Sequence, residues 1–378
     1  MALRAPPELR AANLTTNHDT LTNETKSLPN KCPKQTKTEQ PNQTGKRFSY
    51  FFRTRKKQAT NEPSVKGGTC YLQARSPSSF FRRRGTTKTD KITNSNHAQQ
   101  GKKIQEIRSA VAFRKRKGED FFHTASAIVN GDQIHFALVA DGHGGPQAAK
   151  IIQEKLIDTI VQEMGNDSSV ESLRRAGKIA FQRVHEMVGS TLEDEGKNTF
   201  AGSTSSVVAM SLHTLQVTVM NVGDSHVLFV PESDPNSAFF LSEDHRLENN
   251  EAEARRVVDL GARLAQADIH GYPRGPLRLW PGGLTMGRSI GDFDCKVFVD
   301  PTPSISTYPL RCGNYYVCSD GVWDHVKLDY FKYMSRKYQD INGIVERIMV
   351  KGMEKGKVFD GTGVDMPMDD MTCILLRC

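Results

Sequence analysis

The sequence predicts an α+β fold built from antiparallel strands and paired helices. Two apolar runs, 121–129 and 134–140, flank Asn130-Gly131, and Asn-Gly between two such runs is a strong signal for a β-hairpin. The other strand-like runs come in groups separated by helix pairs, without the regular strand–helix alternation of a parallel sheet. A layered α+β domain is therefore favoured over a doubly wound one.

A basic segment, residues 1–103, precedes the predicted domain. It carries 21 Lys and Arg against 6 Asp and Glu, so the rest of the chain holds 30 against 37. The segment is rich in Asn, Thr, Gln, Lys and Pro and lacks apolar periodicity, a composition that cannot bury enough surface to order itself. We expect a disordered basic tail over 1–103 and one folded domain over 104–378.

The folded part is expected to begin with a strand at 109–113, followed by the basic loop 114–118 and the hairpin. A helix follows, because apolar residues recur every four positions after a proline suited to an opening turn. These residues are Pro146, Ile152, Leu156, Ile160 and Met164. A second helix is expected to begin at Ser168, with Glu171 three positions later as a capping box.

Short β-rich segments return after the second helix and are separated by turn residues. They cover 207–212, 216–222, 226–230, 304–308 and 315–318. Between them a helix is expected over 251–262, whereas the Gly- and Pro-rich stretch 268–283 is predicted to be loop. The apolar run 373–376 follows a final helix, which carries Ile341, Ile344, Val345, Ile348 and Met349 on one side.

Three carboxylates, Asp141, Asp320 and Asp369, lie beside strand-like runs and suggest one shared site. A single Asp-Gly is usually a turn, but three strand-linked acidic clusters make a turn-only explanation weak. Carboxylates without His or Cys partners favour Mg²⁺ or Mn²⁺ over zinc, and the carbonyl of Gly142 can approach an ion that Asp141 binds. Two such ions can activate a bridging water and clamp phosphate oxygens, which is hydrolysis without a covalent enzyme intermediate.

Eight short motifs occur in order between residues 108 and 377. They are Glu119-Asp120, 141–145, 202–204, 221–225, Asp244-His245, 284–292, 319–321 and 369–372. In this order they resemble the metal-dependent protein phosphatases of the 2C type. The resemblance implies a four-layer αββα sandwich with two central antiparallel sheets, and a serine/threonine protein phosphatase that hydrolyses phosphoserine and phosphothreonine in phosphorylated protein substrates.

The resemblance also implies that oxygen ligands hold two Mg²⁺ or Mn²⁺ ions, with a weaker third ion beside them. The assigned residues are Asp141 as the bridging ligand, the carbonyl of Gly142, Asp320 and Asp369 as direct ligands, Glu119 and Asp120 as holders of metal-bound waters, and Asp224 in the third site. His143 is the candidate general acid for the leaving serine or threonine oxygen, a role suited to imidazole near neutral pH.

The phosphate-binding position departs from the family pattern. The family usually has an Arg four residues before the Glu of its Glu-Asp pair, and Lys115 occupies that position here. Lysine binds phosphate as a point charge rather than as a two-pronged fork. Lys115 is the formal match for the phosphate ligand, Arg116 is its rival, and Arg114 is the other flanking arginine.

Further departures concern charged loop residues. Asp370 stands where the family commonly has Asn, and it is expected to add negative charge beside the metals. His226 stands where Arg is frequent and is not an expected metal ligand. Arg288 and Asp292 are expected to form a structural ion pair or loop anchor rather than a catalytic pair.

Targeting signals are weak. No run of about 18 apolar residues and no apolar leader occurs, so neither a membrane span nor a secretory signal is expected. Seven scattered cysteines fit reduced intracellular thiols, which favours the cytoplasm or nucleus. A monomer is expected. An organellar transit peptide is less favoured, because acidic residues interrupt the N-terminal segment.

Two rival functions stay open. A silent phosphoprotein-binding scaffold is suggested by Lys115 and Asp370, although every expected metal carboxylate is present. A nucleic-acid adaptor is suggested by the tail, where 49–57 and 79–84 repeat an aromatic-then-basic pattern. Such segments dock on acidic protein, anionic membrane or nucleic acid, but a solvated linker or a nuclear import signal is the simpler explanation.

Overall fold

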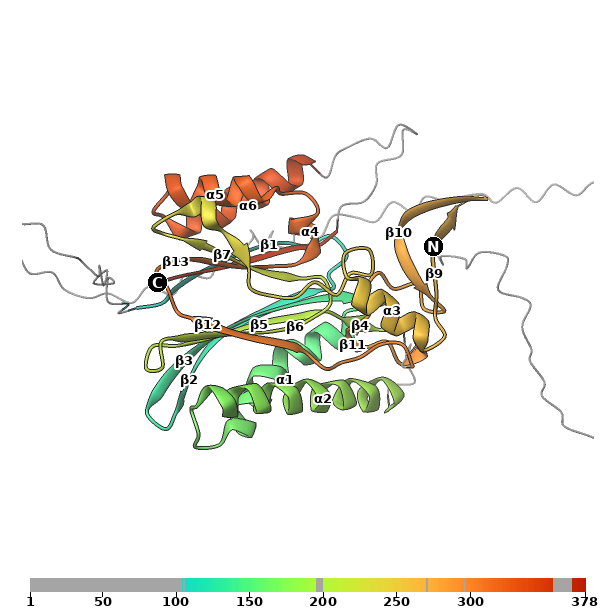
Figure 1. Cartoon of the computed structure of the whole chain (residues 1–378), viewed down its shortest axis with the longest axis horizontal. Helices are drawn as coiled ribbons and strands as arrows, with labels where there is room; N and C mark the ends of the chain where they lie inside the picture. Colours follow the sequence, from blue (N-terminus) through green and yellow to red (C-terminus); the bar gives the residue numbers. More distant parts are fainter. Residues whose placement is uncertain (1–103, 105, 195–199, 270, 296, 356–368) are drawn as a thin grey trace, which may run out of the picture. The chain divides into compact units, whose positions relative to one another are not determined.

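The computed structural model describes residues 104, 106–194, 200–269, 271–295, 297–355 and 369–378. The predicted tail lies outside the described residues. Within them, two antiparallel sheets lie face to face and are covered on their outer faces by helices (Figure 1). The predicted α+β sandwich is therefore confirmed.

The first sheet has the strand order β1-β14-β13-β7-β8. Its strands are β1 (Arg108–Arg114), β7 (His226–Pro231), β8 (Phe239–Phe240), β13 (Gly313–Cys318) and β14 (Met371–Arg377). The second sheet has the order β11-β4-β3-β5-β6-β12, with β2 also paired to β3. Its strands are β2 (Asp120–Val129), β3 (Asp132–His143), β4 (Gly202–Ser203), β5 (Ser205–Ser211), β6 (Gln216–Val222), β11 (Ile290–Gly291) and β12 (Ser304–Pro309).

Helices cover both sheets. The second sheet is covered by α1 (Gln147–Met164) and α2 (Val170–Asp194). The first sheet is covered by α4 (Asp320–Trp323), α5 (Leu328–Lys337) and α6 (Ile341–Lys355). The helix α3 (Glu251–Asp259) packs instead against a separate hairpin of β9 (Arg263–Ile269) and β10 (Tyr272–Trp280). Two 3-10 turns, Pro235–Ser237 and Phe293–Cys295, complete the described elements. None of the helices in the described part of the chain is long and apolar enough to cross a bilayer.

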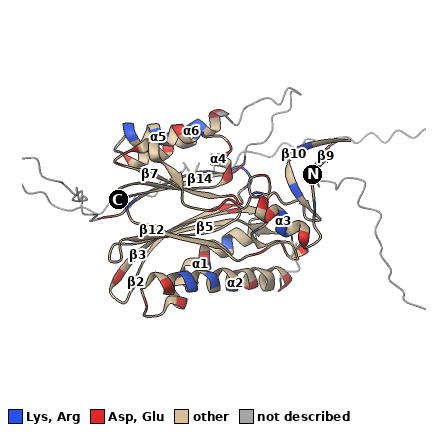
Figure 2. Ribbon diagram, viewed as in Figure 1, with Lys and Arg blue, Asp and Glu red and all other residues tan. Residues whose placement is uncertain are grey.

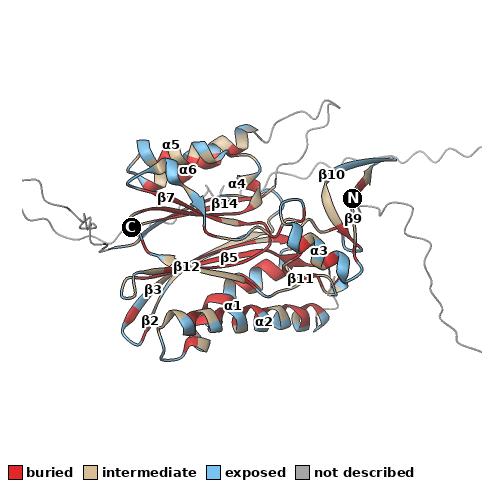
Figure 3. Cartoon of the chain, viewed as in Figure 1, coloured by how far each residue is buried: buried red, intermediate tan, exposed pale blue. Residues whose placement is uncertain are grey.

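The strands carry apolar residues on both faces, because each sheet is covered by helices on one face and by the other sheet on the opposite face. In β3, Leu138 packs toward α1 and α2, whereas Ala137 and Val139 pack in the core between the sheets. In β14, Leu375 packs against the helices of the first sheet, and Ile374 faces the second sheet. Figure 3 shows inner strands of both sheets, such as β5 and β14, as largely buried. This double burial explains the nearly unbroken apolar runs in the sequence.

Local signals behaved as expected at the first hairpin. Asn130 and Gly131 join β2 to β3 with positive φ angles of 49° and 79°, the backbone conformation that a tight hairpin turn requires. The second helix, however, begins at Val170 rather than at Ser168. The hydroxyl of Ser169 accepts a hydrogen bond from the N–H of Ser172 at 3.1 Å, so the cap lies one residue later than predicted.

The prediction of loop over 268–283 is wrong for most of that stretch. β9 and β10 pair in antiparallel register, and the register shifts between Arg274 and Arg278. This irregularity accommodates Gly275 and Pro276, because a bulge tolerates residues that a regular ladder excludes. Gly and Pro here mark a bulged hairpin rather than the absence of strands.

Candidate metal centre

Asp141 lies near the end of β3, opposite Asp120 in the register of β2 and β3. The backbone of Asp141 is held by the segment that contains β4. Its carbonyl accepts hydrogen bonds from the N–H of Thr204 at 2.9 Å and from the hydroxyl of Ser203 at 3.1 Å. Paired strands thus hold the carboxylates of Asp120 and Asp141 next to each other at one end of the second sheet. A functional site needs side chains placed by such regular elements.

Gly142 is required by close backbone packing. Its N–H donates to the carbonyl of Glu119 at 3.1 Å, and a Cβ at this position would lie 2.6 Å from that carbonyl oxygen. Any larger residue would push away the loop that carries Glu119. This packing accounts for the glycine of the motif by itself, and metal binding by the Gly142 carbonyl stays a prediction.

Asp320 reaches the same site from the first sheet. It is the first residue of α4, directly after β13, and Ser319 is the N-cap. Gly321 follows because a Cβ there would lie 2.0 Å from the carbonyl oxygen of Asp370. The charge of Asp320 raises the pKa of Asp141, which places the two carboxyl groups near each other. Figure 2 shows acidic positions at α4. Each sheet therefore contributes one Asp-Gly motif to a shared site.

The gathered carboxylates repel one another. Burial and the neighbouring charges of Asp320 and Asp120 raise the pKa of Asp141 well above its ordinary value. Burial also raises the pKa of Asp120 to about 6 and that of Asp320 to about 7. The hydroxyls of Ser319 and Thr372 each donate to Asp120 at 2.8 Å, but these bonds do not offset burial. A divalent cation would stabilise the ionised forms.

Lysine and arginine side chains pair with some of the carboxylates that were assigned as metal ligands. Lys117 Nζ is 2.6 Å from Asp369 Oδ2, and Arg246 pairs with Asp224 at 2.9 Å and with Asp320 at 3.1 Å. With the described side chains in these positions, no three His, Cys, Asp or Glu residues converge to hold a metal ion. The donor set still fits Mg²⁺ or Mn²⁺, because it consists of hard carboxylate oxygens. A binuclear site then requires Asp369 to exchange Lys117 for an ion.

The basic loop after β1 turns its side chains in different directions. Arg114 pairs with Glu346 of α6 at 2.6 Å, so its guanidinium is already engaged in an ion pair. Lys115 folds back over Gly118, where an added Cβ would lie 2.8 Å from Lys115 Nζ. Lys115 and Arg116 are both exposed, and both stay candidates for the phosphate ligand.

Asp370 anchors this loop. It is 2% exposed, and its two carboxylate oxygens accept hydrogen bonds from the five consecutive backbone N–H groups of residues 116–120. Burial raises the pKa of Asp370, but these backbone hydrogen bonds outweigh burial, so the pKa is lowered overall. The carboxylate of Asp370 is thus held by the loop backbone, and its charge also raises the pKa of Asp120.

His143 is held by Asp292, which the motifs did not pair with it. His143 Nε2 lies 2.8 and 2.9 Å from the two carboxylate oxygens of Asp292, a residue that is 2% exposed. Burial lowers the pKa of His143, but the charge of Asp292 and its hydrogen bond outweigh burial and raise the pKa. Because Asp292 occupies Nε2, Nδ1 is the ring nitrogen left for another partner.

The expected ion pair between Arg288 and Asp292 is wrong. Arg288 Nε and one terminal nitrogen donate to Glu253 Oε1 at 2.8 and 2.6 Å. Glu253 is 3% exposed on α3 and also accepts from Arg256 at 2.9 Å. The pairing depends on how α3 packs against the loop, which no local spacing indicated. Asp292, at the end of the 284–292 motif, and Arg246, directly after Asp244-His245, are functional candidates that the sequence analysis did not connect with the site.

Comparison with known proteins gives one consistent result. The family model described as Protein phosphatase 2C matches residues 109–353. Probable protein phosphatase 2C 69 of Oryza sativa subsp. japonica is 33% identical over 282 residues, which are 70% of this chain and 61% of that protein. Probable protein phosphatase 2C 5 of Arabidopsis thaliana is 33% identical over 226 residues, 57% of this chain and 50% of that protein. The chain thus spans about half to three fifths of these relatives.

Two solved structures share the fold. The structure titled a C.elegans sex determining protein matches with a TM-score of 0.59 at 20% identity, covering 73% of this chain and 66% of that one. The serine-threonine phosphatase 2C from Toxoplasma gondii also matches with a TM-score of 0.59, at 18% identity, covering 72% of this chain and 94% of that one. At these identities the likeness establishes the fold.

Proposed function

Because the chain belongs to the protein phosphatase 2C family, we propose that it is a metal-dependent phosphatase of phosphoserine and phosphothreonine in proteins. The observation that carries this proposal is the meeting of Asp141, Asp120 and Asp320 at one place with raised pKa values. These carboxylates come from two sheets, and their mutual repulsion is relieved by binding divalent cations. Mg²⁺ or Mn²⁺, when bound, would activate water and offset the charge of the phosphate.

The residues of the chain divide the remaining tasks. Lys115 or Arg116 would orient the phosphate from the loop that Asp370 anchors. Asp292 would hold Nε2 of His143, so that Nδ1 can donate a proton to the leaving serine or threonine oxygen. Glu119 accepts a hydrogen bond from the N–H of Gly145 at 2.9 Å, which supports a role in ordering the loop beside His143.

The test is phosphate release from a phosphothreonine peptide by the full-length chain. We expect release with added Mn²⁺ or Mg²⁺, and loss of release with EDTA. Asp141→Ala and Asp320→Asn should each abolish turnover, because they remove ligands of the proposed ions. Asp329→Asn is the matched control, since Asp329 lies on the surface of α5 and pairs only with Lys332 in the described contacts. Metal-independent turnover, or full activity of both site variants, would overturn the proposal.

The rival is a silent phosphoprotein-binding module, favoured by the lysine at position 115. Such a module would bind the phosphopeptide without turnover at every concentration of Mn²⁺.

Compartment and chain organisation are proposed from the sequence: an intracellular monomer, with residues 104–378 as the catalytic domain and residues 1–103 as a tail. Imaging of the tagged full-length chain and its light-scattering mass test these two points.

A further inference from the structure

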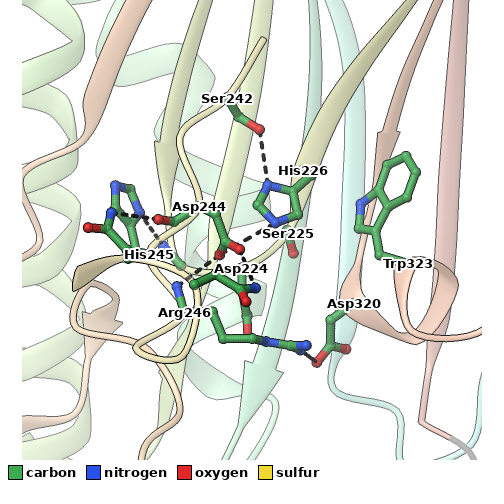
Figure 4. A network of polar contacts seen from close by, with 12 residues as sticks. Asp224, Ser225, His226, Ser242, Asp244, His245, Arg246, Asp320 and Trp323 are labelled. Atoms are coloured by element: carbon green, nitrogen blue, oxygen red, sulfur yellow. Dashed lines mark hydrogen bonds and ion pairs between the residues drawn. The ribbon is translucent and has the colours of Figure 1, made fainter. Parts of the chain in front are cut away.

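Arg246 joins three carboxylates that come from two separate segments. Its Nε lies 2.9 Å from Asp224 Oδ2, one terminal nitrogen lies 2.9 Å from Asp324 Oδ1, and the other lies 3.1 Å from Asp320 Oδ2. Asp224 follows β6, whereas Asp320 and Asp324 stand at the start and the end of α4. Figure 4 shows the guanidinium of Arg246 directed toward Asp320, with Asp224 beside it. A planar guanidinium with five N–H donors suits this arrangement better than an ammonium does.

The backbone around Arg246 is firmly placed. The N–H of Arg246 donates to Asp244 Oδ1 at 2.8 Å, and Asp244 is itself 3.5 Å from His226 Nε2. His245 is fully buried, and its Nδ1 accepts from the N–H of Gly223 at 3.1 Å. The segment that carries Arg246 is thereby tied to the loop that carries Asp224 (Figure 4). These hydrogen bonds fix the backbone of Arg246, so its guanidinium starts from a defined position next to the carboxylates.

Charge and burial favour a cation at this place. The side chain of Asp224 is 1% exposed, and its Oδ1 has no hydrogen-bond partner among the described residues. Burying an ionised carboxylate with an unpaired oxygen destabilises the folded chain unless a positive charge lies beside it. The carboxylates of Asp320 and Asp324 raise the local negative charge further. Arg246 is the cation that all three share.

We propose that Arg246 is a built-in cation that neutralises Asp224, Asp320 and Asp324 and takes the place there of a third divalent ion. A divalent ion bound to the same three carboxylates would lie within a few Å of the guanidinium, and the two like charges would repel each other strongly in a buried site. On this assignment the two ions of the proposed function would be held next to Asp141, and Arg246 would occupy the position of a third. This inference rests on the metal site of the proposed function.

The test is the number of Mn²⁺ ions bound per chain. Full-length protein is stripped with EDTA, dialysed against increasing Mn²⁺, and analysed for bound metal by mass spectrometry. The unaltered chain should saturate at about two ions, and Arg246→Ala should take up about one more, because it exposes three carboxylates with oxygen ligands suited to Mn²⁺. Arg255→Ala is the matched control, since Arg255 pairs with Glu251 on the exposed face of α3. It should leave the count unchanged.

Asp324→Asn provides a second test that does not depend on the folding of Arg246→Ala. Asp324 is about half exposed, at 47% of its side chain, and it is not a ligand of the two proposed ions. We expect this variant to keep about two ions. If the unaltered chain binds three ions and Asp324→Asn binds two, the third ion rather than Arg246 neutralises the carboxylates, and the inference is wrong. Binding of two ions without hydrolysis would instead count against the proposed function alone, and no uptake of Mn²⁺ by either chain would overturn both.

Discussion

At the residue scale, contacts between side chains far apart in the sequence determine which charged residues pair, and the motifs did not indicate these contacts. The strand-like runs led us to expect Asp141, Asp320 and Asp369 in one place. The structure brings Asp141 and Asp320 together with Asp120, which only the family resemblance had named, whereas Asp369 pairs with Lys117. The sequence could not indicate that Asp292 turns to His143 and that Arg288 turns to Glu253. Such choices depend on tertiary packing and rotamers, for which no local periodicity exists.

Asp292 is expected to act as a positioning residue for His143. Asp292→Asn keeps the shape of the side chain but removes the charge that holds Nε2 and favours the protonated ring. We expect kcat to fall by about 10- to 100-fold, the order of a weakened general acid, with little change in KM. Steady-state kinetics on the phosphothreonine peptide measure both constants.

The neighbouring variant Asp294→Asn controls for the loss of one charge in this loop, since Asp294 is exposed. It should retain nearly full activity. A change confined to KM in Asp292→Asn, or equal losses in both variants, would contradict the assigned role of Asp292.

At the element scale, periodic segments were predicted well and exceptional ones were not. The hairpin of β2 and β3 and the helix α1 followed from strong local patterns. The strands β9 and β10 were missed because a bulge allows Gly and Pro within a pair of strands. The helix α5 was also missed, although its buried residues Phe331 and Met334 are three positions apart, a spacing typical of one helix face.

The link between β14 and the basic loop gives a prediction about Asp370. Asp370→Ala would leave five backbone N–H groups without their acceptor, so we expect unfolding to require about 1–3 kcal/mol less free energy. The loop that carries Lys115 would lose its anchor, and KM for the phosphopeptide should rise. Urea unfolding and steady-state kinetics measure the two effects.

Asp370→Asn offers a graded comparison, because its amide has one oxygen to accept hydrogen bonds where the carboxylate has two. It should fall between the unaltered chain and Asp370→Ala. Asp158→Ala, on the exposed side of α1, controls for removal of an aspartate. Unchanged KM and stability in Asp370→Ala would show that the loop is ordered by other contacts.

At the scale of the whole folded part, the two sheets share one hydrophobic core and one acidic site. Val227, Tyr315 and Val317 of the first sheet pack with Val208 and Val219 of the second. This core brings the carboxylates together against their own repulsion. The layer order could be expected from the family resemblance, whereas the positions of Lys117 and Arg246 on the carboxylates could not, because they depend on side-chain reach across separate segments.

Metal binding should therefore stabilise the entire folded part. Addition of Mn²⁺ at about one hundred times its Kd should increase the free energy of unfolding by roughly 2.7 kcal/mol per independent site, because the ion binds the folded chain and relieves the repulsion. Scanning fluorimetry with Mn²⁺ and with EDTA measures the resulting difference in Tm. Asp141→Ala should lose most of that difference. An equal Tm with and without Mn²⁺ would contradict a metal site of this kind.

The central place of β14 also has a consequence for synthesis on the ribosome. β14 lies between β1 and β13, which are made before it, and the two residues ahead of it are Asp369 and Asp370. Until residues 371–377 emerge, the facing edges of β1 and β13 have no partner, and pairing across so long a stretch of chain is intrinsically slow. The edge of β1 therefore has no β14 to pair with while all the strands between them in the sequence are made. The pairing of β14 in the first sheet and the anchoring of the basic loop by Asp370 depend on the same segment of chain.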